Sequence, residues 1–459
     1  MKSQLVNVNG ALFTEINKPE SEKDQKKIKQ LNLKKTELQL AFNNLKKELE
    51  EKYPNYANVK YPKIYDLNLL RARIIDRTSA VISYFSGNEA SYGWYISKKQ
   101  LKMVKFPAKA DLKKLIEKYR ITLKDPLSFY DDEEDAEVDN RRLHLAIGLK
   151  LYDTLIRPFD IEPEIKSILM LADGALHYLP FETLITKLDI SSKGYQAANQ
   201  RYLIEDYSVY YAPSASVLGA AMDNLRQRTD KPDDANTFLG FGDPEFSLAK
   251  ADETVKADPV FKQKGFYELS RLHATATEVN KISSLFSNSN QVFYQQGALE
   301  EKAKELSESY KYIHFATHGI LDEENPEFSG VVLNLVREQK EDGFLKSSEI
   351  WDMRLKADLV TLSACETGLG KIVSGEGMVG LTRSFLYAGS ASVVVSLWTV
   401  ADDSTSELMI NFYEYLKQGY PKIEALRQAK LEFVVKQQKT GDFQDPFYWG
   451  PFVLNGMQQ

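Results

Sequence analysis

The chain has 459 residues, of which 43% are hydrophobic and 27% are charged, as is ordinary for a globular protein of two or three domains. A net charge of −6 gives no electrostatic basis for binding nucleic acid or a membrane surface. The only cysteine, Cys365, excludes an internal disulfide and a zinc site of several thiolates. A single free cysteine suits a reducing compartment. The chain shows neither a signal peptide nor an apolar run of the ~18 residues that span a bilayer. We therefore expect a cytoplasmic protein.

Residues 1–62 are expected to form an N-terminal helical or coiled-coil arm. The stretch from Ser21 to Tyr53 is rich in Lys, Glu, Gln and Leu, and its apolar residues recur every third or fourth position, which is typical of an amphipathic helix. Residues 1–20 show no clear period. The helix is expected to end at Tyr53-Pro54, because proline cannot continue it.

Residues 63–232 are expected to form a first α/β region. Strands are predicted at 80–85, 91–96, 101–106 and 167–172, and helices at 112–122 and 141–156. The acidic run Asp131–Asp135 is interpreted as a solvated loop, and binding of a basic partner segment is the alternative. The last strand is followed by residues 175–182, which include His177.

Residues 233–459 alternate between apolar β-prone runs and helical patterns. Strands are predicted at 237–242, 291–295, 311–316, 330–335, 358–363 and 391–397, and a last run at 448–454. Helices are predicted at 274–286, 298–309, 347–352, 377–388, 404–417 and 421–437. This alternation predicts an α/β fold with a parallel sheet that is covered by helices on both faces.

Two of these strands end at reactive side chains. The run from Tyr312 leads into His318-Gly319, and the run from Leu359 leads into Cys365. Ligands bind beyond the carboxyl ends of parallel strands, so His318 and Cys365 are expected to face each other across one cleft. An imidazole that takes the thiol proton would let the thiolate attack a carbonyl carbon. The alternative for a lone cysteine is a small buried apolar residue.

Longer motifs resemble one family, the caspase- and separase-like CHAT family, whose members are often fused to tetratricopeptide repeats. They are His314-Phe-Ala-Thr-His318-Gly, Leu362-Ser-Ala-Cys-Glu-Thr-Gly-Leu-Gly370, Gly375-Glu-Gly-Met-Val-Gly-Leu-Thr-Arg383, Ser396-Leu-Trp-Thr-Val400 and Ala425-Leu-Arg427. The resemblance implies a caspase-like protease lobe at 233–459, preceded by a degenerate caspase-like lobe at 63–232 that scaffolds it.

The resemblance also implies an activity. It is that of a cysteine endopeptidase with catalytic His318 and Cys365, a thioester intermediate and an oxyanion hole formed by the N–H groups of Gly319 and Cys365. No metal or organic cofactor is expected. The expected partners are a protein substrate and an activating protein or upstream helical repeats.

Four further residues are predicted to contact substrate. Asp402 and Asp403 follow the strand after the cysteine strand, and the resemblance to separase suggests a carboxylate there that selects a basic side chain. Helix capping is the alternative, because Ser404-x-x-Glu407 has the pattern of a capping box. Trp398 is expected to line this pocket or to belong to the core, and Glu376 lies in a glycine-rich loop of the kind that shapes specificity.

Two other functions remain open from the sequence. One is a catalytically silent scaffold that binds a partner through the helical arm and the α/β body. The other is a cysteine hydrolase or acyltransferase that acts on a small molecule, which a His–Cys pair alone does not exclude.

Overall fold

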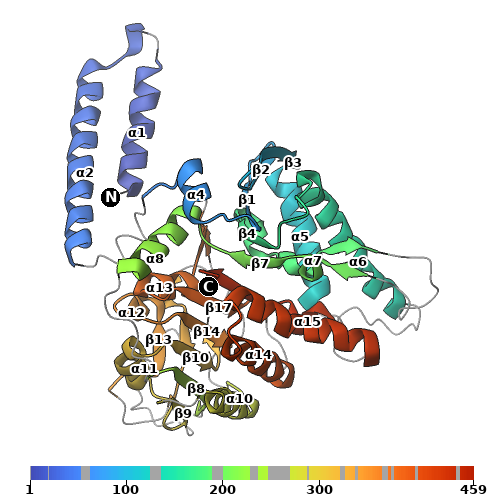
Figure 1. Ribbon diagram of the computed structural model, residues 1–459. Coiled ribbons are helices and arrows are strands. Elements are labelled where there is room, and N and C mark those ends of the chain that lie inside the picture. Colours follow the sequence, from blue (N-terminus) through green and yellow to red (C-terminus); the bar gives the residue numbers. More distant parts are fainter. Residues whose placement is uncertain are drawn as a thin grey trace. The chain divides into compact units, whose positions relative to one another are not determined.

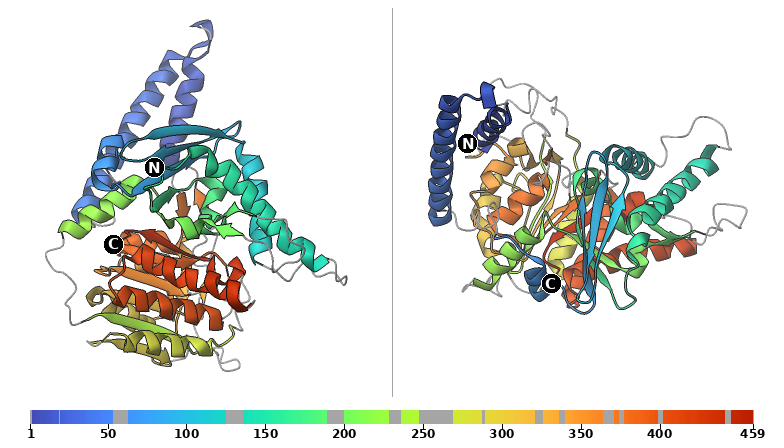
Figure 2. Two further views of the ribbon diagram at one scale, coloured as in Figure 1. Left: turned by 45° about the vertical axis from the view of Figure 1, so that its right-hand side comes forward. Right: turned by 90° about the horizontal axis from the view of Figure 1, so that it is seen from above.

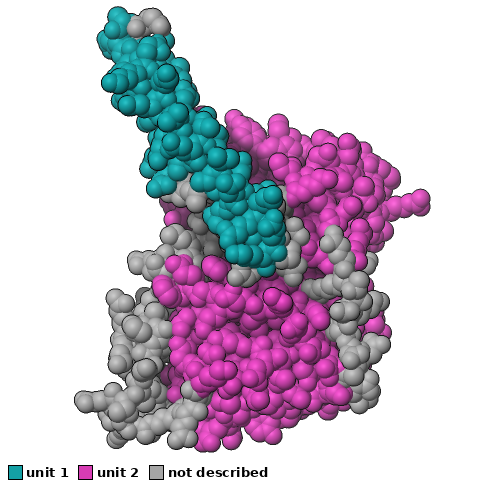
Figure 3. Space-filling model, turned by 90° about the vertical axis from the view of Figure 1, so that its left-hand side faces the viewer, with its two compact units in different colours: residues 1–62 teal, residues 63–459 magenta. Residues whose placement is uncertain are grey.

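The computed structural model describes residues 2–18, 20–52, 63–124, 136–188, 200–227, 236–246, 269–286, 289–320, 326–335, 340–363, 371–373, 377–398, 402–440 and 445–458. The chain forms two compact units, residues 1–62 and 63–459, which are coloured separately in Figure 3. The division into three domains that the sequence suggested stays a prediction. Within the described residues, no helix is both long and apolar enough to cross a lipid bilayer.

The first unit is a helical hairpin of α1 (Lys2–Ile16) and α2 (Gln25–Lys52) (Figure 1). Helix α1 occupies a stretch in which the sequence showed no clear period. It is stabilised by contacts beyond its own sequence, because the buried carboxylate of Glu15 lies 2.9 Å from the ammonium groups of both Lys18 and Lys27. Lys27 belongs to α2, so this ion pair fastens the two helices together.

The second unit is built on one sheet of eleven strands, in the order β3-β2-β1-β4-β7-β18-β17-β14-β10-β8-β9 (Figure 1). Its strands are β1 (Ser79–Phe85), β2 (Ser91–Ile96), β3 (Leu101–Phe106), β4 (Ser167–Leu171), β7 (Ser208–Tyr211), β8 (Phe238–Pro244), β9 (Gln291–Gln295), β10 (Tyr312–Ala316), β14 (Leu359–Ser363), β17 (Ser392–Ser396) and β18 (Phe452–Gly456).

Nine strands of this sheet form two parallel blocks that run in opposite directions. One block contains β1, β4, β7 and β18, and the other contains β17, β14, β10, β8 and β9. They meet where β17 and β18 pair antiparallel, with Ser392 opposite Gly456. Strands β2 and β3 pair antiparallel at the β1 edge of the sheet. The predicted parallel sheet is therefore confirmed as a mainly parallel one, with antiparallel pairing at this edge and between the two blocks.

Helices cover both faces of the sheet, because successive side chains of a strand point to opposite faces. On β14, for example, Val360 and Leu362 belong to one apolar core and Leu359 to the other. The first core is closed by α5 (Lys109–Lys124), α6 (Ala136–Leu155), α11 (Glu300–Leu306), α12 (Ser347–Ile350) and α13 (Leu381–Ala388). The second core is closed by α10 (His273–Ser284), α14 (Asp402–Lys417) and α15 (Lys422–Thr440), which lie along one side of the unit in Figure 2.

One predicted helix, 377–388, is wrong at its N-terminal end. Residues Lys371–Val373 (β15) and Gly377–Val379 (β16) form a small antiparallel hairpin, and α13 begins only at Leu381. Gly377 and Gly380 explain the difference, because glycine is unfavourable in a helix interior.

The final segment contains a turn of helix that the sequence did not predict. Helix α16 (Pro446–Trp449) precedes β18, and its N-cap is Asp445, whose carboxylate accepts the N–H of Phe447 at 3.0 Å. Proline at the first helical position fits this geometry, because no intrahelical partner exists for an N–H there.

Helix α15 fastens the two parallel blocks to each other. The Lys430 ammonium lies 3.2 Å from the Glu182 carboxylate, with exposed fractions of only 1% and 3%, and the Tyr211 hydroxyl donates to the same carboxylate. Burial lowers the pKa of Lys430.

Arg427 donates to the carbonyl groups of Ile204 at 2.7 Å and Glu205 at 2.9 Å. The predicted motif at 425–427 thus joins the C-terminal helix to the first α/β region.

The buried pair predicts a large stability effect. Lys430→Met should lower the free energy of unfolding by about 3–5 kcal/mol, because it leaves the Glu182 charge buried without its partner. Adding Glu182→Gln should restore much of this loss. The control is Lys113→Met, which removes an exposed pair with Glu117 and should cost less than about 1 kcal/mol. Urea unfolding measures the free energy of unfolding of each variant. Equally small losses of this free energy in Lys430→Met and Lys113→Met would contradict the proposed contribution of the buried pair.

Candidate active site

Strands β10 and β14 lead to the two predicted catalytic residues. They are parallel neighbours, and their register places Ala316 opposite Ser363. His318 is the second residue after Ala316, and Cys365 is the second residue after Ser363. Cys365 lies outside the described residues, so the distance between the two side chains stays a prediction. The strands that precede them are adjacent and end at the same level of the sheet.

The His318 ring is held by a backbone carbonyl. Its Nε2 atom lies 2.7 Å from the oxygen of Ser270. A carbonyl can only accept, so Nε2 carries the hydrogen in this bond and Nδ1 is the unprotonated nitrogen of the neutral ring. Phe246 packs beside the ring, with centroids 5.0 Å apart. The sequence did not reveal Ser270, because any residue can supply a carbonyl.

The turn after His318 is fixed by a small second sheet. Strand β11 (Gly319–Ile320) pairs antiparallel with β12 (Gly330–Val332), and the Val332 N–H donates to the His318 carbonyl at 2.9 Å. Bonded and non-bonded pairs alternate along an antiparallel ladder. Gly319 opposite Val331 is therefore a non-bonded pair, and the Gly319 N–H points away from β12.

The predicted substrate-contacting residues lie in different environments. Helix α14 begins at Asp402, two residues before the predicted start, so Asp403 lies in its first turn, where it is exposed. Trp398 is 1% exposed, and its indole N–H donates to the Phe447 carbonyl at 3.0 Å, so it belongs to the core. Glu376 and the Asp402 side chain lie outside the described residues. Contact of these residues with substrate stays a prediction.

His314 is enclosed by the fold and lies away from the surface. Its Nε2 atom is 2.7 Å from a carboxylate oxygen of Glu278, and its Nδ1 atom is 3.3 Å from the hydroxyl of Tyr413. That hydroxyl lies 2.9 Å from the hydroxyl of Thr361. Both His314 and Glu278 are fully buried. This polar chain links β10, β14, α10 and α14 on the face opposite the first core.

A third histidine, His177, lines a small cavity of about 30 Å³ together with Thr382, Arg383 and Asn455. It lies in the short 3₁₀ helix Gly174–Tyr178, and its Nε2 atom is buried without a hydrogen-bond partner among the described residues. Burial lowers the pKa of His177 to about 4. The ring is therefore neutral near pH 7 and contributes to packing beneath α13.

This lowered pKa predicts a pH-dependent stability. His177 binds a proton near pH 6.5 when unfolded but only near pH 4 when folded, so the unfolded state gains more protons as the pH falls between these values. The free energy of unfolding should drop in this window by about 3 kcal/mol at most. His177→Gln should remove this part of the pH dependence, and the exposed control His273→Gln should not. Denaturant titrations at pH 7 and pH 4.5 measure the free energy of unfolding of the three proteins. The same drop between these two pH values in wild type, His177→Gln and His273→Gln would refute the assigned role of His177.

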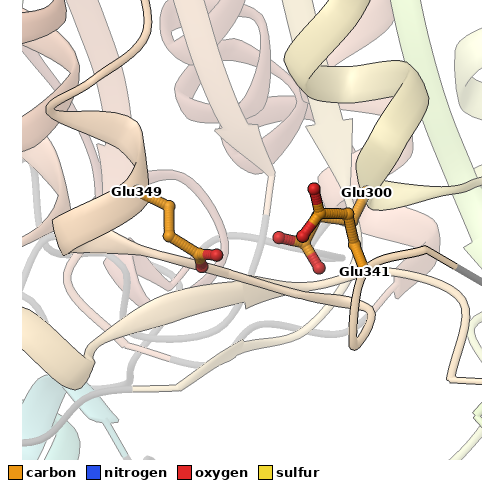
Figure 4. A group of neighbouring side chains, drawn as sticks. All are labelled: Glu300, Glu341 and Glu349. Carbon is orange, nitrogen blue, oxygen red and sulfur yellow. The ribbon is translucent and has the colours of Figure 1, made fainter.

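One acidic group has the spacing of metal ligands. Glu300, Glu341 and Glu349 have carboxylate oxygens within 4.8 Å of one another (Figure 4). The Lys304 ammonium lies 2.7, 3.1 and 2.9 Å from these three carboxylates. Glu300 also accepts the Gly343 N–H at 2.8 Å. An ammonium thus already supplies the positive charge between these carboxylates, and the group fits an ion-pair network better than a metal site.

The fold can now be compared with solved structures. The chain of the Saccharomyces cerevisiae separase–securin complex solved at 3.0 Å superposes with a TM-score of 0.51 and 10% sequence identity. The match covers 99% of this chain and 37% of the solved one. The protein therefore has the caspase-like fold of separase, and at this identity the likeness concerns the fold alone.

The sequence comparisons identify the family. The CHAT domain matches residues 145–457, which is more than half of the chain, so the protein belongs to the CHAT-domain family as its motifs predicted. Tetratricopeptide repeat protein 28 of Mus musculus is 24% identical over 347 residues, and that of Homo sapiens is 23% identical. Each alignment covers 67% of this chain and only 13% of the relative, so the chain spans a small part of these relatives.

Proposed function

We propose that the protein is a cysteine endopeptidase in which Cys365 is the nucleophile and His318 is the general base. The observation that carries this proposal is the in-register pairing of β10 and β14, because each strand is followed, two residues later, by one member of the pair. The hydrogen bond from His318 Nε2 to Ser270 supports it, since it leaves Nδ1 able to accept a proton. The separase-like fold and the CHAT family membership support the same chemistry.

The proposed reaction has two stages. Nδ1 of His318 takes the thiol proton, and the Cys365 thiolate attacks the scissile carbonyl to form a tetrahedral oxyanion. The imidazolium then protonates the leaving amine, and a thioester remains. Water, activated by the same imidazole, hydrolyses the thioester and frees the thiol.

Two backbone N–H groups are proposed to stabilise the oxyanion, those of Gly319 and Cys365. The direction of the Gly319 N–H, away from β12, leaves it available for this role. Glycine also lets a substrate backbone approach closely, because it has no Cβ. Each such donor typically contributes about 3 kcal/mol in the transition state.

We further infer that a protein partner controls access to the site. The matched relatives are tetratricopeptide repeat proteins, and the separase chain was solved in complex with securin. The alignment covers 13% of the Mus musculus relative, and the proposed control is by an activating protein or by upstream helical repeats. The proposed substrate is a protein.

The dyad proposal predicts the effect of removing either residue. Cys365→Ala and His318→Ala should each reduce the yield of cleavage products about 10³-fold or more. The double variant should show no larger reduction than either single variant, because nucleophile and base act as one unit. The exposed control Lys113→Ala should retain activity. Comparison of new protein N-termini in cells that express each variant measures this.

A thiol-reactive peptide distinguishes the proposed cysteine peptidase from a catalytically silent scaffold. With one cysteine in the chain, an adduct found by mass spectrometry can form only at Cys365. Adduct formation that is lost in His318→Ala supports the dyad. Cleavage that survives in Cys365→Ala would place the chemistry elsewhere, and an unreactive Cys365 with no new N-termini would favour the interaction scaffold.

A further inference from the structure

We propose that the ion pair between Asp243 and Arg271 is a positioning pair for His318. This inference rests on the proposed role of His318 as general base. Arg271 is the residue next to Ser270, whose carbonyl holds the His318 ring at 2.7 Å. Asp243 directly follows Gly242, which lies opposite Ala316 in the parallel pairing of β8 with β10. The pair therefore joins the end of β8 to the segment that orients the histidine.

The ion pair has a geometry that fixes orientation as well as distance. Nε of Arg271 lies 2.8 Å from one carboxylate oxygen of Asp243, and an Nη atom lies 2.7 Å from the other. Two parallel bonds hold the guanidinium in one plane, which a single bond to lysine cannot do. Asp243 is 4% exposed and Arg271 is 45% exposed, so a buried carboxylate anchors a guanidinium at the surface.

Asp243 holds the same segment at a second point. Its backbone N–H donates to the hydroxyl of Thr275 at 2.7 Å, and that hydroxyl donates to the Leu272 carbonyl at 2.7 Å. The carboxylate therefore binds one end of residues 271–275 and the backbone binds the other end. Because residues 271–275 are bonded to Asp243 at both ends, they hold the Ser270 carbonyl, which directly precedes them, in place.

The backbone of Asp243 supports a specific role for its side chain. Its φ angle is +43°, in the left-handed region that favours glycine. An aspartate in this conformation costs energy that glycine would avoid, and such strain persists where the surrounding structure holds the residue in place. Here the side chain supplies both acceptor oxygens for Arg271.

The consequence for chemistry concerns the tautomer of His318. If the Ser270 carbonyl moves, Nε2 loses its acceptor and nothing fixes the ring hydrogen there. A ring with the hydrogen on Nδ1 cannot take the thiol proton through that atom. The Asp243–Arg271 pair would thus preserve the proposed base without touching the substrate.

The test uses the full chain with isotope-labelled histidine. Imidazole nitrogen chemical shifts report which ring nitrogen is protonated, and His318→Gln identifies the His318 signals. The wild type should show the Nε2–H tautomer, and Arg271→Gln and Asp243→Gly should each show a mixture. Asp243→Gly relieves the backbone strain, so its melting temperature should change little while the tautomer changes. The matched control is Arg157→Gln, which removes an exposed pair with Asp153 and should leave His318 unaltered.

A second readout connects positioning to reactivity. Alkylation of Cys365 by a peptide warhead should slow about 10- to 100-fold in Arg271→Gln and Asp243→Gly, because a small misplacement of the base has effects of this size. Arg271→Lys keeps the charge but loses the two-bond contact and should be intermediate. An unchanged His318 tautomer in both variants would overturn the positioning pair. A changed tautomer with cleavage surviving in Cys365→Ala would support the pair and contradict the dyad.

Discussion

The parallel pairing of β10 with β14 is the interaction on which the rest of this structure depends. Its register, from Tyr312 opposite Leu359 to Ala316 opposite Ser363, decides which side chains enter each core. A shift by one residue would turn every side chain of a strand to the other face. His314 would then leave its bond to Glu278, and the chain after Ala316 would no longer leave the sheet level with the chain after Ser363.

The residues that match the family motifs fall into two groups in the structure. Those after β10 and β14 belong to the proposed site. Others are structural, such as Arg427, which binds carbonyl groups of the first α/β region. The two parallel blocks meet in the antiparallel ladder of β17 and β18, which runs from Ser392 opposite Gly456 to Ser396 opposite Phe452. Within the first block, the register of β18 with β7 is the single pair Asn455 and Tyr211, and side chains of α15 add further bonds to this region.

The sequence predicted several strands with the bounds that the structure shows, because alternating or continuous apolar runs flanked by turn residues mark them locally: 91–96, 101–106 and 291–295. Helix α1 was missed because its stability depends on packing against α2. The antiparallel direction of β18 was missed because a local pattern carries no information about the neighbouring strand. His318 was predictable as a side chain at a strand end, whereas Ser270 and the Asp243–Arg271 pair act through the backbone and through distant contacts.

The central claim is that His318 and Cys365 form one catalytic unit, and the pH dependence of Cys365 alkylation tests it most directly. Iodoacetamide reacts with the thiolate, and this chain offers a single cysteine. We predict that wild-type Cys365 reacts with an apparent pKa of about 7 or lower, and that His318→Gln returns it toward the ordinary value of about 8.5. Identical pH profiles for the two proteins, both with the ordinary thiol pKa, would contradict the dyad.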